Sequence, residues 1–116
     1  MPRSECLFCK IAAGQIPADV VHDGERVLAF RDISPQAPVH VLVIPKEHIA
    51  SLAEAADGHG EILGEILLLA RDLALAEGIA EAGFRTVINA GRDGGQSVDH
   101  LHLHLLGGRS LRWPPG

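Results

Sequence analysis

Tyrosine is absent from this chain of 116 residues, and the remaining aromatic residues, three phenylalanines and one tryptophan, make up only 3% of it. The core must therefore be built mainly from Leu, Ile, Val and Ala. Positive charge is also scarce, because the formal net charge is −5 with the histidines neutral. Without a cluster of Lys and Arg, we expect no binding of a nucleic acid polymer. A small anionic ligand stays open, since a few local donors can hold one phosphate.

Long apolar runs are missing as well. The longest, Ile62 to Ala70, is interrupted by Gly64 and Glu65 and is too short to cross a membrane. The N-terminus does not show the charged-then-apolar pattern of a signal peptide. With 47% hydrophobic and 22% charged residues, the chain has an ordinary globular composition. We expect a single soluble domain over residues 1–116, without a membrane partner and located in the cytoplasm.

Cysteine occurs only twice, as Cys6 and Cys9 in "ECLFCK". A disulfide framework needs more cysteines and an extracellular setting. A C-x-x-C pair can instead be half of a zinc site or a redox dithiol, and it can also consist of two small buried side chains. A redox pair is expected after a strand and at the start of a long helix, so zinc is the better functional interpretation. It requires two further ligands.

Hydrophobic periodicity and turn residues predict an α+β protein. The expected order is a helix over 5–13 capped by Ser4, a hairpin turning at Asp23 and Gly24, a strand over 39–45, a long helix over 61–77, and strands over 84–90 and 98–106. Hairpins followed by a long helix favour an antiparallel sheet of about five strands with the helices on one face. The terminal "WPPG" is expected to pack as a unit.

The segment "HLHLHLL" places His100, His102 and His104 at alternate positions. In a strand these side chains share one face, while the leucines between them share the other and face the core. Three interpretations compete for the histidines: a metal site, a catalytic site, or a solvated polar face. Histidines two apart lie about 7 Å apart along a strand, so two of them can reach one ion more easily than three.

A catalytic role would use a neutral imidazole nitrogen as the nucleophile, with the other nitrogen held by an acceptor. The preceding loop "NAGRDGGQSV" suits a phosphate, because Gly94 and Gly95 allow close approach of the backbone while Gln96 and Ser97 add side-chain donors. Such loops are mostly simple turns. Directly before the histidine strand, this one indicates a phosphate pocket.

These motifs resemble the histidine triad (HIT) superfamily. The triad itself, "FRDISPQAPVHVLVIPKEHI", "DGGQSVDHLHLHLLGGR" and the terminal "WPPG" are similar to its Hint branch, the histidine triad nucleotide-binding proteins. The resemblance extends from Cys6 to Gly116. It implies the HIT-like fold, and it implies hydrolysis of the P–N bond in purine nucleoside phosphoramidates, with adenosine 5′-monophosphoramidate as the expected type.

The resemblance also implies catalytic roles. His102 would attack the α-phosphorus and form a covalent nucleotidyl-histidine, which water then hydrolyses to a nucleoside monophosphate. His104 would hydrogen-bond the phosphate and help to protonate the leaving group. Ser97 would lie near the leaving group, and His40 matches a fourth histidine that lines the site.

Nucleotide-binding residues follow from the same resemblance. The phosphate segment would comprise Asn89, Gly95, Gln96, Ser97 and Val98, with Asp32 on the ribose hydroxyls and Phe8, Phe30, Ile33 and Leu42 around the base. By themselves, these residue types also have ordinary structural interpretations. Asp32 could cap the "SPQAP" turn, Phe8 and Ile33 could belong to the core, and Asn89 could end a strand.

Some bacterial HIT proteins, and the related galactose-1-phosphate uridylyltransferases, bind zinc through a C-x-x-C pair and two histidines. The matching residues here are Cys6, Cys9, His48 and His100, which would form a closed structural site. His22 and His59 match no motif and are expected at the surface.

The Hint resemblance further implies a homodimer in which the partner's tail approaches the active site. Two other functions remain open. One is a nucleotide-binding module that acts through a protein partner, and the other is a dinucleoside polyphosphate hydrolase. The loop "GGQSV" and the tail favour the Hint branch over the latter, and the short chain argues against a transferase.

Overall fold

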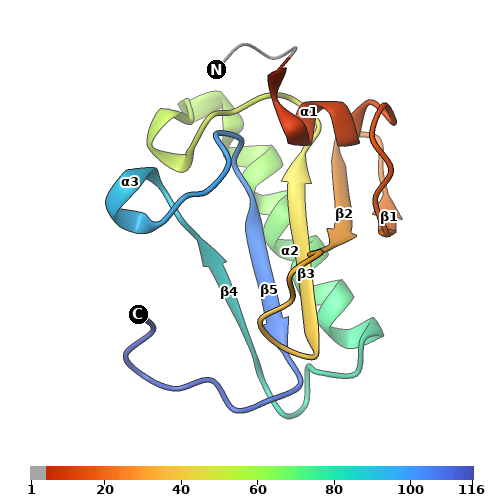
Figure 1. Cartoon of the computed structure of the whole chain (residues 1–116), viewed down its shortest axis with the longest axis vertical. Helices are drawn as coiled ribbons and strands as arrows, with labels where there is room; N and C mark the ends of the chain where they lie inside the picture. The colour runs from red at the N-terminus through yellow and green to blue at the C-terminus, as the bar shows by residue number, and fades with distance from the viewer. Residues whose placement is uncertain (1–4) are drawn as a thin grey trace.

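The computed structural model describes residues 5–116, which form one antiparallel five-stranded sheet and several helices (Figure 1). The sheet order is β1-β2-β3-β5-β4, and every neighbouring pair is antiparallel. The elements are α1 (Leu7–Ala12), β1 (Val20–Asp23), β2 (Val27–Arg31), β3 (Val39–Pro45), η2 (Leu52–Glu54), η3 (Asp57–His59), α2 (Gly60–Ala76), β4 (Phe84–Ile88), α3 (Gly91–Gly94) and β5 (Leu103–Gly107). The predicted α+β class, the hairpin and the long helix are confirmed.

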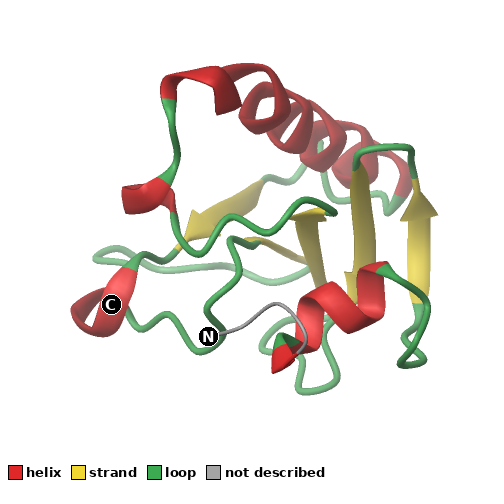
Figure 2. Cartoon of the chain, turned by 90° about the horizontal axis from the view of Figure 1, so that it is seen from above, coloured by secondary structure: helices red, strands yellow, loops and turns green. Residues whose placement is uncertain are grey.

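The two principal helices cover opposite faces of the sheet, so the prediction of helices on one face is wrong (Figure 2). The α2 helix packs against the face that carries Val41 and Leu103. The short α1 helix packs Phe8 against Phe30 and Leu42 on the other face. The reason is that β2 and β3 are buried on both sides, and a strand with two apolar faces must be covered twice.

The histidine segment is only partly a strand. The predicted strand over 98–106 begins at Leu103, because the chain from Val98 to Leu101 turns instead of pairing. The His100 amide donates to the Val98 carbonyl at 2.8 Å, and the Leu101 amide donates to the Ile49 carbonyl at 2.7 Å. The leucine face is nevertheless confirmed, since Leu101, Leu103 and Leu105 are all fully buried.

Both ends of the chain differ from expectation. The first helix begins at Leu7, and the Cys6 thiol caps it by accepting from the Cys9 amide; the predicted cap Ser4 lies outside the described residues. The expectation that "WPPG" packs as a unit is wrong within this chain, because Trp113 is 83% exposed. None of the helices within residues 5–116 is long and apolar enough to cross a membrane.

Candidate active site and metal centre

A cavity of about 280 Å³ lies between α1 and the adjacent face of the sheet. Nine of the predicted site residues line it: Phe8, Phe30, Asp32, Ile33, Leu42, Ser97, Val98, His102 and His104. The wall also includes residues that the sequence analysis did not single out: Leu7, Ile11, Ile16, Pro17, Ala18 and Arg31. For two of these residues, Leu7 and Ile11, the sequence did offer a signal, because their i, i+4 spacing places both on one face of α1.

His102 is held in one tautomer by the backbone. Its Nδ1 lies 2.7 Å from the His100 carbonyl oxygen, which can only accept, so the proton of neutral His102 resides on Nδ1. The lone pair of Nε2 is therefore free for attack. The edge-on ring of Phe8, with its centroid 5.1 Å away, packs against the imidazole. His102 is 2% exposed, so this orientation is fixed by packing as well as by the hydrogen bond.

A second group of polar side chains adjoins His102. His40 Nε2 lies 2.9 Å from His104 Nδ1 and 3.5 Å from Asp32 Oδ2. Burial lowers the pKa of His40, against the opposing effect of Asp32. Burial, assisted by the neighbouring His102 and His40, lowers the pKa of His104 to about 4. Both rings are therefore neutral at pH 7.

Asp32 stabilises the turn that follows β2 and also lines the cavity. Its Oδ1 accepts from the Ser34 amide at 2.8 Å, which is the turn cap considered from the sequence. The other oxygen, Oδ2, remains on the side of His40 and the cavity. One carboxylate can thus hold the turn and still offer an acceptor to a ligand.

The predicted phosphate loop contributes unequally to the cavity. Ser97 and Val98 line it, whereas Asn89, Gly95 and Gln96 are not among its lining residues. The Gln96 amide donates to the carbonyls of Ala50 (2.7 Å) and Val98 (2.9 Å), while its oxygen accepts from the Gly91 amide. Gln96 therefore holds the loop in place through these hydrogen bonds and does not line the cavity itself.

Four sulfur and nitrogen donors converge beside this site. The Cys9 thiol lies 3.2 Å from His48 Nδ1, and His100 Nδ1 lies 3.4 Å from the Cys6 sulfur and 3.5 Å from that of Cys9. All four donor atoms lie within 4.8 Å of one another. Tetrahedral zinc, with bonds of about 2.3 Å to sulfur and about 2.0 Å to nitrogen, separates these donors by about 3.6 Å. The cluster fits structural Zn²⁺.

His100 connects the metal cluster to the catalytic candidate. Its Nε2 donates to the Pro45 carbonyl at 2.8 Å, which leaves the Nδ1 lone pair directed at the thiols. Its own carbonyl accepts from His102. His100 is fully buried, and burial is the main cause of its lowered pKa. A neutral imidazole with a hydrogen bond on its far nitrogen is the state that a metal ligand requires.

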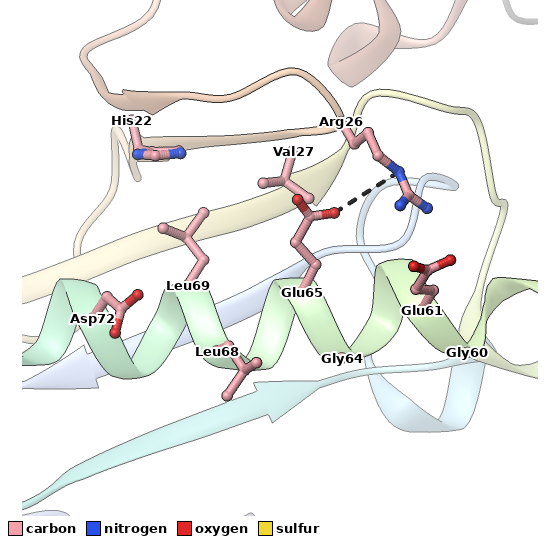
Figure 3. A pocket seen from close by; sticks show the side chains of 10 residues that line it. All are labelled: His22, Arg26, Val27, Gly60, Glu61, Gly64, Glu65, Leu68, Leu69 and Asp72. Carbon is pink, nitrogen blue, oxygen red and sulfur yellow. Dashed lines mark ion pairs between the residues drawn. The ribbon is translucent and has the colours of Figure 1, made fainter.

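A larger cavity, of about 560 Å³, lies between the β1–β2 hairpin and α2 (Figure 3). Arg26 Nε lies 3.8 Å from Glu65 Oε2 there, and His22, an exposed histidine as predicted, borders it. It contains none of the predicted site residues. Size does not identify the functional site here, because the buried His102 and the half-buried His104, whose pKa is lowered, line the smaller cavity. The other unassigned histidine, His59, pairs with Glu47 at 3.1 Å.

Comparison with known proteins agrees with this geometry. The HIT domain family matches residues 13–111. A "14 kDa zinc-binding protein" of Zea mays is 53% identical over 97% of this chain and 89% of its own. The crystal structure of a HIT family hydrolase from Legionella pneumophila superposes with a TM-score of 0.95 at 57% identity, covering 97% of this chain and 100% of its own. A histidine triad nucleotide-binding protein from Candida albicans gives a TM-score of 0.80 at 34% identity, covering 95% and 83%.

Removing one thiol should abolish metal binding. We expect Cys9→Ser to reduce zinc from one ion per chain to nearly none, measured by elemental analysis of the purified protein. If wild type binds zinc with the free ion at a thousandfold excess over Kd, the variant should lose about 4 kcal/mol of unfolding free energy. Equal zinc contents in the two proteins would contradict the assignment. His22→Ala, at an exposed histidine outside the cluster, is the matched control.

Acid should destabilise the fold through His104. Its pKa is about 4 when folded against 6.5 ordinarily, so between these values the unfolded chain binds a proton that the folded chain does not. The free energy of unfolding should therefore fall as pH drops from about 6.5 towards 4, by up to about 1.4 kcal/mol per pH unit, and stay level above that range. Urea denaturation across pH 4.5–8 should show a shallower fall in His104→Asn. Identical slopes, at equal zinc content, would refute this.

Proposed function

The chain belongs to the HIT domain family, and from this premise we propose that it is a hydrolase of the Hint branch, one domain over residues 1–116, that cleaves the P–N bond of purine nucleoside phosphoramidates. The observation that carries the proposal is the tautomer of His102. With Nδ1 donating to the His100 carbonyl, Nε2 presents its lone pair at the wall of the cavity. A neutral imidazole so oriented is a competent nucleophile for phosphorus.

The reaction would proceed in two displacements. His102 Nε2 attacks the α-phosphorus, a new N–P bond forms, and the bond to the departing nitrogen breaks with its electron pair leaving on that nitrogen. The amine takes a proton: His104 would help to supply it, and Ser97, whose exposed side chain lines the cavity, would lie near this leaving group. Water then attacks the same phosphorus: an O–P bond forms, the N–P bond breaks with its electron pair returning to His102 Nε2, and a proton of the water leaves to solvent. The nucleoside monophosphate is released and neutral His102 is regenerated. Two moderate barriers replace one high barrier.

The residues that line the cavity favour a nucleoside as the ligand. Phe8, Phe30 and Leu42 form an apolar floor, and Ile33 at the rim is fully exposed, so a bound base would cover it. Asp32 Oδ2 is available for the ribose hydroxyls because Oδ1 already accepts from Ser34. The phosphate would lie against the loop at Ser97 and Val98, with Asn89, Gly95 and Gln96 shaping that loop from behind. His104 would then hydrogen-bond the phosphate.

Structural zinc completes the proposal. Cys6, Cys9, His48 and His100 would hold the ion, which supplies a rigid cross-link and no reaction chemistry. It would join α1, which forms one wall of the cavity, to the backbone that orients His102. Such thiolates must stay reduced, which suits the cytoplasm.

Replacing the nucleophile separates the competing functions. We expect His102→Ala to lose at least about a thousandfold in AMP release from adenosine 5′-monophosphoramidate, because removal of a covalent nucleophile costs at least that much. AMP binding, measured by calorimetry, should persist, and His22→Ala should behave as wild type.

Other outcomes would redirect the proposal. Wild type that binds AMP but turns over below about 10⁴ M⁻¹s⁻¹ in kcat/KM would favour a nucleotide-binding module acting through a protein partner. Faster cleavage of a dinucleoside polyphosphate than of the phosphoramidate would favour the polyphosphate hydrolase. Unchanged turnover in His102→Ala would refute the covalent mechanism.

We also propose that the protein forms a homodimer through β4 and the exposed side of α2. β4 is an edge strand, and it carries Phe84, which is 39% exposed. On α2, Leu68 and Leu75 are 53% and 63% exposed. A second copy would cover these side chains. The exposed Trp113 would then contact the partner instead of its own chain.

A positive charge introduced into β4 tests the proposed dimer. Phe84→Arg should weaken dimerisation by at least about thirtyfold, as expected for a central aromatic contact worth about 2 kcal/mol. Sedimentation equilibrium of both proteins, with melting temperatures as a check on folding, measures this. A monomeric wild type at high micromolar concentration would contradict the proposal.

A further inference from the structure

The exposed turn between β2 and β3 is bonded to the end of β5 through one residue. Gln36 donates its backbone amide to His40 Nδ1 at 3.0 Å. Its carbonyl oxygen accepts from Arg109 twice, from Nε at 3.1 Å and from Nη2 at 3.0 Å. Gln36 therefore links a guanidinium on one side to a buried imidazole on the other.

The Gln36 amide decides where His40 carries its proton. Because a backbone N–H can only donate, His40 Nδ1 must accept, and the proton of the neutral ring lies on Nε2. That proton is directed at His104 Nδ1, 2.9 Å away, with Asp32 Oδ2 at 3.5 Å. His104 Nδ1 then accepts in turn, so the proton of neutral His104 lies on its Nε2.

The same reasoning excludes a metal ion from this group. Asp32, His40 and His104 offer three donor atoms within 4.8 Å of one another. A metal on His40 Nε2 would require the proton on Nδ1, where the ring already accepts from Gln36. The group is instead a directed chain of hydrogen bonds that ends in a donor on His104.

Arg109 is one of the attachments of the turn to the body of the protein, beside the buried Ala37. Ser34, Pro35 and Gln36 are all exposed, so burial does little to hold them. The approach of β5 to the turn requires Gly108, where φ is +90° and a Cβ would lie 2.9 Å from Pro38 Cβ. Arg109 follows directly, and its planar fork holds the Gln36 carbonyl with two donors.

We propose that Arg109 is a positioning residue that acts through Gln36 to fix the tautomers of His40 and His104. In this arrangement His104 presents Nε2–H as a ready hydrogen-bond donor to the oxygen on which negative charge develops during attack at phosphorus. The tautomer assignment is independent of the reaction, whereas the effect on turnover rests on the function proposed above. Arg109 itself touches no reacting atom.

Histidine-labelled protein gives a direct readout. Long-range ¹H–¹⁵N correlation spectra distinguish protonated from unprotonated ring nitrogens, and wild type should show Nε2–H for both His40 and His104. Arg109→Gln should place part of the His40 population in the Nδ1–H form. Arg109→Lys, which keeps one donor, should fall between the two. Arg26→Gln, which removes a guanidinium at the larger cavity, should match wild type.

Turnover should follow the tautomers. We expect Arg109→Gln to lower kcat for adenosine 5′-monophosphoramidate by about tenfold with KM within about twofold, less than the 10²–10³ lost when such a donor is removed outright. Arg109→Lys should recover part of that loss. A merely structural role would lower the melting temperature and leave the His40 tautomer unchanged.

The outcomes that overturn the proposal are distinct from those that overturn the function. Unchanged His40 and His104 tautomers in folded Arg109→Gln would refute it, as would an Nδ1–H form of His40 in wild type. If Arg109→Gln does not fold, the tautomers of Arg109→Lys decide by the same criterion. A wild type with the expected tautomers but without phosphoramidate turnover would refute the proposed function and leave the positioning role of Arg109 standing.

Discussion

The buried His100 is the constraint on which the site depends. Three of its atoms have separate partners: Nδ1 faces the two thiols, Nε2 donates to the Pro45 carbonyl, and the backbone oxygen accepts from His102. These contacts join α1, the end of β3 and the segment before β5. A change at any one of them would shift the ring or carbonyl that holds the next. Metal binding, the position of α1 and the orientation of the His102 ring therefore depend on one another.

His102 and His104 have opposite hydrogen-bonding properties at Nε2 because their Nδ1 atoms have different partners. His102 has an acceptor behind it, so its proton is held on Nδ1 and its Nε2 offers a lone pair. His104 has His40 behind it, so Nδ1 accepts and Nε2 carries the proton. Burial lowers the pKa of His104 and so keeps its ring neutral. The tautomer of the ring, and not a positive charge, therefore makes Nε2 a hydrogen-bond donor. The same residue type thus offers a lone pair at His102 and a hydrogen-bond donor at His104, which are the two properties that the proposed mechanism requires.

The sheet explains why this group lies where it does. β2 and β3 are buried on both faces, so one face is covered by α2 and forms the larger core, while the other is covered by α1 only in part. The part that α1 leaves open is the cavity. Its apolar wall and its polar end come from the same strand, because Leu42 and His40 lie two residues apart on β3 and therefore share the face opposite α2.

Local sequence determined the elements and the identity of the reactive groups. The alternation of Leu101, Leu103 and Leu105 predicted the buried face, and the C-x-x-C pair predicted half of a metal site. Such patterns follow from backbone geometry over a few residues, which is why they can be read without the fold. The resemblance to HIT proteins named the remaining ligands and most of the cavity wall.

Tertiary structure alone decided the rest. The chain around His100 leaves the strand because its ring reaches thiols 94 and 91 residues away in sequence, and α1 lies opposite α2 because β2 and β3 need cover on both faces. Gln96 was expected at a phosphate but holds the loop through carbonyls of Ala50 and Val98. The proton positions on His40 and His104 depend on Gln36 and on each other. Each of these four features depends on which partner atom lies within contact distance. Contacts between residues far apart in sequence bring that partner atom there, and local periodicity does not.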